Sequence, residues 1–234
     1  MNTLNEIRQA LRRLTVNQRM AVELWLRQLD GIPTPANDIR EAQPAYVAAG
    51  PAFMTLEEFF EFEEKSLVRH EFVNGVLYAM CGPSLAHNSI IQNLAFAIRN
   101  HLKRGPCRVF SSEAKLIIQR NANEISYYPD VVVDCRPDTR GTHYVQDPRL
   151  VLEVLSPSTQ HIDRREKLQN YCQIDSLEEY VLVSQDECRV TVYPRVDRWK
   201  ARVYGGLDTA LELRSIDLAI PLSELYADAV PFTA

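Results

Sequence analysis

The chain has 234 residues, a formal net charge of −5, 46% hydrophobic residues and 24% charged residues. This composition is typical of a globular protein with a sizeable core, and the acidic balance does not favour a general nucleic-acid binder. No apolar run approaches the roughly 18 residues that cross a bilayer, and the N-terminus lacks the pattern of a signal peptide. The five cysteines, without Cys-x-x-Cys spacing, argue against a disulfide framework and a thiolate zinc site. We therefore expect a cytoplasmic protein without a membrane partner.

The first 52 residues are predicted to be separate from the main domain. Within residues 1–30, apolar side chains recur at helical spacing on both sides of the capping-box pattern Thr15–Gln18, which predicts a helical hairpin. Two short amphipathic helices bury little surface alone, so they are expected to pack on each other, on the main domain or on a second copy in a homodimer. Residues 31–52 carry four prolines and no regular period, which predicts a linker. The main domain is then residues 53–234.

This domain is expected to open with a helix, a hairpin and a long helix. Thr55–Glu58 is a second capping box, which predicts a helix to about Glu64. Asn74–Gly75 lies between apolar residues and predicts a tight β-hairpin, because both residues tolerate positive φ. Apolar residues at helical spacing then predict a helix over residues 84–103, ended by Gly105–Pro106.

The rest of the chain is predicted to be rich in strands. Asp163 is interpreted as the N-cap of a helix from Arg164 to about Ile174, with Glu166 completing the capping box, and residues 221–226 as a final helical turn. The expected strands are Cys107–Phe110 continuing through Lys115–Gln119, Ile125–Val133, Leu150–Leu155, Tyr180–Ser184, Arg189–Pro194, Trp199–Tyr204 and Leu211–Leu213. This order of elements predicts an α/β or α+β fold with a mixed sheet. No Gly-rich phosphate loop follows a strand, which disfavours the dinucleotide and P-loop folds.

Two acidic residues lie within apolar strand segments. Asp130 comes directly before Val131–Val133, and Glu153 lies between Leu152 and Val154. A carboxylate is costly to bury unless a cation or strong hydrogen bonds hold it. Carboxylates and carbonyls are the ligands that Mg²⁺ prefers, and a nearby lysine can stabilise charge that develops on a phosphate. Asp130 and Glu153, with Lys167 on the following helix, therefore predict a metal-assisted hydrolytic site, to which Glu71 and the Val154 carbonyl are candidate further ligands.

Two basic clusters accompany these acids. Residues 99–108 contain Arg99, Lys103, Arg104 and Arg108 with no acid among them, and Arg164, Arg165 and Lys167 form the second cluster. Nucleic-acid contact and a solvated helix end, where cations are favoured by the helix dipole, are both open interpretations.

Several stretches resemble the PD-(D/E)XK nuclease superfamily, and within it the restriction-endonuclease-like group of uncharacterised bacterial proteins. The resemblance covers about residues 53–205. It implies a restriction-endonuclease-like core with flanking helices, DNA as the partner and Mg²⁺ or Mn²⁺ as the cofactor. It also implies that Asp130 and Glu153 are metal ligands, that Glu71 is a helper ligand or a water-holding base, and that Lys167 is the catalytic cation. The matching stretches are Glu71–Met80, His87, Tyr128–Val133, Leu152–Thr159, Asp163–Tyr171, Glu179–Ser184 and Val190–Tyr193.

The chain departs from the superfamily motif at one position. The motif has a lysine two residues after the glutamate, where this chain has Leu155. The resemblance implies that the lysine has moved to Lys167, with Lys115 as the second candidate. The leading interpretation is a metal-dependent endonuclease that hydrolyses phosphodiester bonds in DNA; the alternatives are a catalytically inactive DNA- or protein-binding module of the same fold and a hydrolase of a small phosphorylated metabolite. His87, at the start of the long helix, is open between contact with a phosphate and a structural role.

Overall fold

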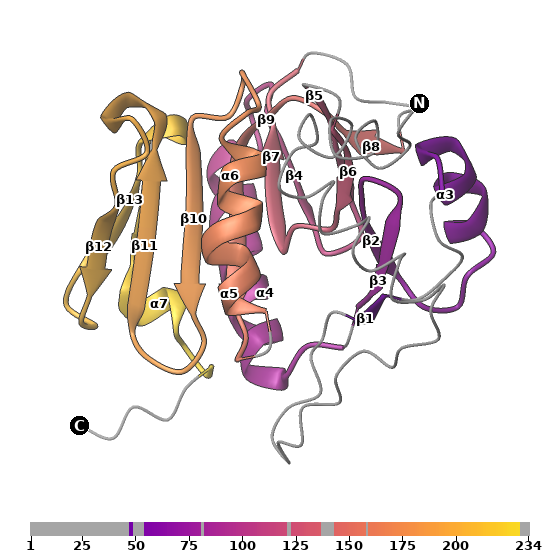
Figure 1. Cartoon of the computed structure of the whole chain (residues 1–234). Helices are drawn as coiled ribbons and strands as arrows, with labels where there is room; N and C mark the ends of the chain where they lie inside the picture. The colour runs from indigo at the N-terminus through magenta and orange to yellow at the C-terminus, as the bar shows by residue number, and fades with distance from the viewer. Residues whose placement is uncertain are drawn as a thin grey trace, which may run out of the picture. The chain divides into compact units, whose positions relative to one another are not determined.

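The computed structural model describes residues 47–48, 54–80, 82–120, 123–136, 143–157 and 159–229 (Figure 1). The predicted helical hairpin of residues 1–30 lies outside them, and of the predicted linker only β1 (Val47–Ala48) is described. The chain divides into two compact units, one of Met1–Met80 with Asn121–Ile125 and one of Cys81–Arg120 with Ser126–Ala234. Among the described residues, no helix combines the length and the apolar character needed to cross a membrane.

The described part of the first unit consists of a helix and a small antiparallel sheet. Helix α3 (Leu56–Glu63) begins with the predicted capping box, in which Thr55 accepts from the Glu58 amide and Glu58 accepts from the Thr55 amide. The predicted hairpin is also confirmed: β2 (His70–Val73) and β3 (Val76–Ala79) pair through Asn74 and Gly75, whose φ angles are 50° and 95°. β1 pairs antiparallel with β3, so the predicted linker contributes a two-residue strand.

The second unit contains a six-stranded mixed sheet with the order β12-β11-β10-β9-β7-β4. Only the pairing of β9 with β10 is parallel in this order; the other neighbours run antiparallel. Outside it, β5 (Lys115–Arg120) pairs with β8 (Tyr144–Val145), and β13 (Ala210–Leu213) pairs with β14 (Leu218–Pro221). The six strands are β4 (Arg108–Ser111), β7 (Val131–Asp134), β9 (Pro148–Leu155), β10 (Glu179–Ser184), β11 (Arg189–Pro194) and β12 (Arg202–Gly205). The predicted mixed sheet is therefore confirmed.

Helices lie on both faces of this sheet (Figure 1). On one face, α4 (Leu85–Leu102) packs its apolar stripe against alternate residues of β9, namely Leu150, Leu152 and Val154. The other face carries a continuous helical segment made of α5 (Gln160–Ile162), the π-helical turn η1 (Asp163–Lys167) and α6 (Leu168–Tyr171). Because strand side chains alternate between faces, the intervening position Glu153 points to the side opposite the α4 core. The shorter helices are η2 (Arg195–Asp197), η3 (Arg214–Ile216) and α7 (Leu222–Leu225).

Three predicted element boundaries are wrong. The expected strand through residues 107–119 is broken between β4 and β5, where Ser112 has a φ of 48°. The expected strand Ile125–Val133 is two strands, β6 (Asn123–Tyr127) and β7, separated by a segment that contains Pro129; proline has no amide hydrogen to donate to a ladder. Asp163 is not an N-cap: its φ of −61° and ψ of −39° are helical, and the segment already begins at Gln160.

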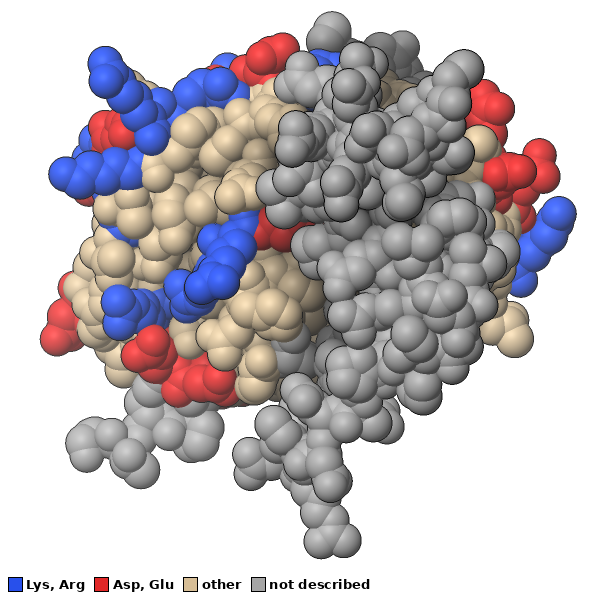
Figure 2. Space-filling view, viewed as in Figure 1, with Lys and Arg blue, Asp and Glu red and all other residues tan. Residues whose placement is uncertain are grey.

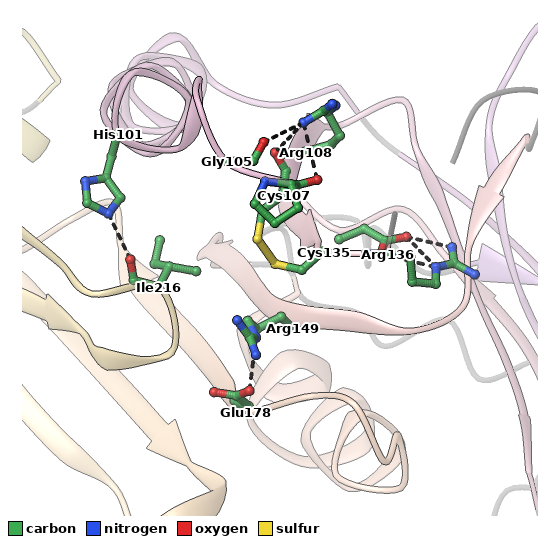
Figure 3. The surroundings of a disulfide bond; sticks show 11 residues. His101, Gly105, Cys107, Arg108, Cys135, Arg136, Arg149, Glu178 and Ile216 are labelled. Carbon is green, nitrogen blue, oxygen red and sulfur yellow. Dashed lines mark hydrogen bonds and ion pairs between the residues drawn. A yellow bond between two sulfur atoms is a disulfide. The ribbon is translucent and has the colours of Figure 1, made fainter. Parts of the chain in front are cut away.

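Cys107 and Cys135 form a disulfide, which the sequence argument against a disulfide framework missed (Figure 3). Cys107 precedes β4 and Cys135 follows β7, and the antiparallel register pairs their neighbours Arg108 and Asp134. The pairing thus depends on the sheet and could not be read from spacing. Disulfides persist mainly in oxidising compartments, so the cytoplasmic location, which implies reduced thiols at these positions, stays a prediction.

Candidate active site

Asp130 and Glu153 face each other across two neighbouring antiparallel strands. Val131, the first residue of β7, pairs with Leu152 of β9. Asp130, directly before β7, therefore lies opposite Glu153, and directly opposed residues share one face of a sheet. Their carboxylates and backbones are linked reciprocally. The Val154 amide donates to Asp130 Oδ2 at 2.7 Å, and the Asp130 amide donates to Glu153 Oε2 at 3.3 Å. Backbone amides of the sheet region therefore hold one oxygen of each carboxylate.

Lys167 reaches Glu153 from the helical segment. Its Nζ lies 3.2 Å from Glu153 Oε1 and 3.3 Å from Asp163 Oδ1. The same Glu153 oxygen accepts a hydrogen bond of 2.9 Å from the Tyr171 hydroxyl. Asp163, Lys167 and Tyr171 follow one another at intervals of four residues on one helix face, and all three side chains are buried, with relative exposures of 2%, 6% and 0%. The structure thus brings the predicted lysine to the predicted glutamate.

This cluster contains more carboxylates than ammonium groups. Asp130, Glu153 and Asp163 supply three carboxylates, Lys167 supplies one ammonium, and Glu153 is only 3% exposed. Buried carboxylates are strongly destabilising unless cations or hydrogen bonds compensate them. Burial and the neighbouring carboxylates of Asp163 and Glu153 raise the pKa of Tyr180 well above its usual value of 10, so its hydroxyl remains a donor. It donates to the Asp163 carbonyl at 3.0 Å.

His87 is part of the same surroundings. It lies in the first turn of α4, where Ser84 caps the helix by accepting from the His87 amide. Its Nε2 lies 3.2 Å from Asp130 Oδ1, whereas its buried Nδ1 has no hydrogen-bond partner among the described residues. His87, for which the sequence left two interpretations open, therefore contacts the Asp130 carboxylate.

Sequence reasoning missed Tyr127 and Asn170 as members of this network. The Tyr127 hydroxyl donates to Glu166 Oε1 at 2.9 Å and accepts from Asn170 Nδ2 at 2.7 Å. The Tyr127 ring lies beneath Lys167, with 5.2 Å between Nζ and the ring centroid, a cation–π arrangement. The only sequence signal was the spacing of Glu166 and Asn170, which places them on one helix face; Tyr127 is 43 residues from Asn170, and only the fold brings it there.

Other candidates lie elsewhere. Glu71 is 2% exposed on β2 of the first unit, and its place in the site stays a prediction. Lys115 Nζ lies 5.8 Å from the centre of the Tyr128 ring. In the basic segment 99–108, Lys103 bonds to Asn100 and Arg108 bonds to nearby backbone carbonyls, as in a solvated helix end. Val154 contributes its amide to Asp130, and the predicted role of its carbonyl is untested.

The donor set fits a hard divalent cation only in a minimal form. Among the described residues, no group of three or more His, Cys, Asp or Glu side chains is arranged to hold a metal ion. Asp130 and Glu153 provide two carboxylates on adjacent strands, however, and Mg²⁺ commonly binds through one or two carboxylates while it keeps several waters. The oxygen chemistry of the pair therefore suits Mg²⁺ or Mn²⁺.

The mixed sheet, its helices on both faces and the Asp–Glu–Lys cluster define a restriction-endonuclease-like α/β protein. A solved structure described as a putative nuclease belonging to DUF820 from Anabaena variabilis ATCC 29413 has this fold: the TM-score is 0.63 at 19% identity, over 76% of this chain and 99% of the other.

The chain belongs to the Uma2 family, described as "Putative restriction endonuclease", whose model matches residues 56–223. The family resemblance predicted from sequence is thereby confirmed. Two uncharacterised relatives come from Synechocystis sp. (strain ATCC 27184 / PCC 6803 / Kazusa). The protein slr1290 is 36% identical over 73% of this chain and 90% of its own length, and sll1609 is 30% identical over 64% of this chain and 85% of its own length.

Proposed function

We propose that the protein is a metal-dependent endonuclease that hydrolyses phosphodiester bonds in DNA with Mg²⁺ or Mn²⁺. The observation that carries the proposal is the contact of 3.2 Å between Lys167 Nζ and Glu153 Oε1. Leu155 occupies the motif position of the lysine, and this contact supplies an ammonium to the glutamate by another route. The family match to residues 56–223 supports the same class of reaction.

The roles of the residues follow from their chemistry. Asp130 and Glu153 would hold the ion, with Glu71 and the Val154 carbonyl as the further ligands predicted from sequence. When bound, the ion supplies a polarised phosphate and a water of lowered pKa. The Lys167 ammonium stabilises negative charge that develops on the phosphate. Tyr171 and the backbone amides of Asp130 and Val154 keep the two carboxylates in place.

Exposed cations on the helical segment support a nucleic-acid partner. Arg164 and Arg165 are exposed on η1, the turn that also carries Asp163 and Lys167. Figure 2, viewed as Figure 1, shows basic side chains over the region of α5, η1 and α6. Arginines at such positions pair with backbone phosphates and carry most of the sequence-independent affinity for DNA. This local positive charge can act despite the net charge of −5, because a local patch attracts phosphates at short range whatever the overall charge.

A binding module that kept the fold without catalysis is the second candidate. The observation that favours it is that Leu155 occupies the motif position of the catalytic lysine. A cytoplasmic location and a homodimer formed through residues 1–30 remain further predictions. Size exclusion of the full chain and of a chain lacking residues 1–50 tests the dimer, which is refuted if the two have the same oligomeric state.

Cleavage of plasmid DNA in Mg²⁺ or Mn²⁺ tests the proposal. The wild-type protein should nick the plasmid, chelation with EDTA should stop it, and Glu153→Gln should cut below detection while still binding DNA in a mobility-shift assay. Glu187→Gln is the matched control, because its carboxylate is 60% exposed and lies outside the cluster. Cleavage by Glu153→Gln at the wild-type rate would refute the proposal. Binding of DNA without cleavage in either metal, unaffected by Asp130→Ala, would identify the binding module instead.

A further inference from the structure

Lys167 is held from two sides by buried carboxylates. Its Nζ lies at nearly equal distances from Glu153 Oε1, 3.2 Å, and Asp163 Oδ1, 3.3 Å. Glu153 belongs to the strand and has the proposed role of metal ligand, whereas Asp163 belongs to the same helical turn as the lysine. No step of the proposed reaction uses Asp163, although it is only 2% exposed. A carboxylate at this depth requires a reason for its burial.

The position of Lys167 on a helix, rather than on strand β9, provides that reason. A lysine two residues after Glu153 on β9 would share its face of the sheet through strand alternation alone. A lysine that arrives from a helix has a flexible four-carbon stem and three rotatable donors, so its ammonium is not fixed by the backbone. Asp163, four residues earlier on the same helix, is placed to restrict it. The hydrogen bond from Tyr180 on β10 to the Asp163 carbonyl ties this turn to the sheet.

The turn itself is unusual. Asp163–Lys167 is π-helical and is flanked by the short α-helical segments α5 and α6. Single π-helical turns within α-helices are rare and occur frequently at functional sites. Here the turn carries both members of the Asp163–Lys167 pair, which joins the local backbone irregularity to the cluster on β9.

We propose that Asp163 is a positioning residue for the hydrolysis: its carboxylate holds the Lys167 ammonium against Glu153, in place of the strand backbone that fixes a lysine in the superfamily motif. This inference rests on the proposed function. Asp163 is not itself expected to touch the substrate, so its loss should affect turnover more than binding of DNA.

Two measurements on Asp163→Asn test the proposal, after circular dichroism has established that the variant is folded. The first is the rate at which a lysine-specific acylating reagent labels Lys167 in the metal-free protein, read by peptide mass spectrometry relative to the exposed Lys103. Because the variant loses a hydrogen bond between charged groups, we expect labelling to be about tenfold faster. The second is steady-state cleavage, in which kcat should fall roughly 10- to 100-fold, the usual effect of losing an outer-shell partner, while KM for DNA stays within about twofold.

Asp175→Asn is the matched control, because it removes the same charge from a side chain that is 89% exposed beyond the end of α6; both values should remain as in the wild type. If Asp163→Asn does not fold, Asp163→Glu, which displaces the carboxylate by one methylene, takes its place with the same expected outcomes. Wild-type labelling of Lys167 in the variant would overturn the proposal, as would faster labelling with unchanged kcat. If the wild type cuts no DNA, the proposed function fails, and labelling alone still decides whether Asp163 holds Lys167.

Discussion

The Tyr171→Phe substitution isolates one hydrogen bond of the cluster. Tyr171 is fully buried, and its ring packs edge-on against Tyr127 at a centroid distance of 5.5 Å and in a tilted arrangement against Tyr180 at 5.0 Å. Its hydroxyl donates to Glu153 Oε1 at 2.9 Å. Phenylalanine keeps the ring and its aromatic contacts and removes only the donor. The substitution therefore measures the hydrogen bond to the buried carboxylate with little change in packing.

The expected loss of stability follows from the charge of the acceptor. A hydrogen bond to a charged group contributes about 1.5–3 kcal/mol, against about 1 kcal/mol for a neutral pair. Lys167 still contacts the same oxygen of Glu153 in the variant, so the carboxylate is not left bare. We therefore expect the lower part of that range, a loss of about 1.5–2 kcal/mol, which lowers Tm by roughly 3–8 °C in a domain of this size.

Tyr180→Phe is the internal comparison. Tyr180 is also fully buried, but its hydroxyl donates to a neutral backbone carbonyl, that of Asp163, at 3.0 Å. Its loss should cost about 1 kcal/mol and lower Tm by roughly 2–4 °C.

Urea unfolding at pH 7 in EDTA, followed by circular dichroism, measures both variants without an effect of bound metal. If Tyr171→Phe costs no more than Tyr180→Phe, the hydroxyl of Tyr171 does not stabilise a charged Glu153 and the reasoning fails.

Three further predictions concern pH and thiols. Folding raises the pKa of Tyr180 above its unfolded value near 10, so the stability tied to its protonated hydroxyl is present below about pH 10 and is lost as the pH rises above 10. The difference in unfolding free energy between wild type and Tyr180→Phe should therefore narrow above pH 10. A difference that stays constant across this range would contradict the raised pKa. Reduction of the Cys107–Cys135 disulfide, whose cysteines are 28 residues apart, should lower the unfolding free energy by about 3–4 kcal/mol. The double variant Cys107→Ser/Cys135→Ser is the control, and its stability should not change with dithiothreitol. Equal stability of the wild type with and without reductant would argue against the disulfide. Burial raises the pKa of Cys172 from 9.0 to about 11, so at pH 7 it should alkylate about 100-fold more slowly than an unperturbed thiol, and a normal alkylation rate would show that the thiol is accessible.

The sequence predicted those structural features whose interacting residues lie within a few positions of one another. The Thr55 capping box and the Asn74–Gly75 turn are complete within four residues of chain, and both are confirmed. The interpretation of Asp163 as an N-cap failed because the helical segment already begins at Gln160, so Asp163 lies inside the segment rather than at its start. An N-cap carboxylate accepts from its own backbone, whereas the Asp163 carboxylate lies against Lys167. Pro129 could have signalled the break between β6 and β7, since proline cannot continue a central strand.

The candidate site could be predicted where burial alone was informative. Asp130 and Glu153 were recognised because an acid inside an apolar strand must find compensation, and the structure places them across β7 and β9 with reciprocal hydrogen bonds. Tyr127 and the disulfide could not be predicted, because their partners are separated by tens of residues and meet only through the register of the sheet. Sequence spacing predicts which residues share one face of a helix or a strand. It does not predict which helix face packs against which strand.

Placing the lysine on the helix changes what the site depends on. β9 alone would set the distance between Glu153 and a lysine at position 155, and Leu155 is instead a 5% exposed apolar residue on that face. With Lys167 on η1, the distance depends on how the helical segment packs on the sheet, and one contact that sets this packing joins Tyr180 on β10 to the Asp163 backbone. The cost of moving the cation off the strand is therefore a wider set of residues that control its position. The buried network of tyrosines and carboxylates around Lys167 is the physical consequence, since a flexible ammonium is fixed only where several partners hold it.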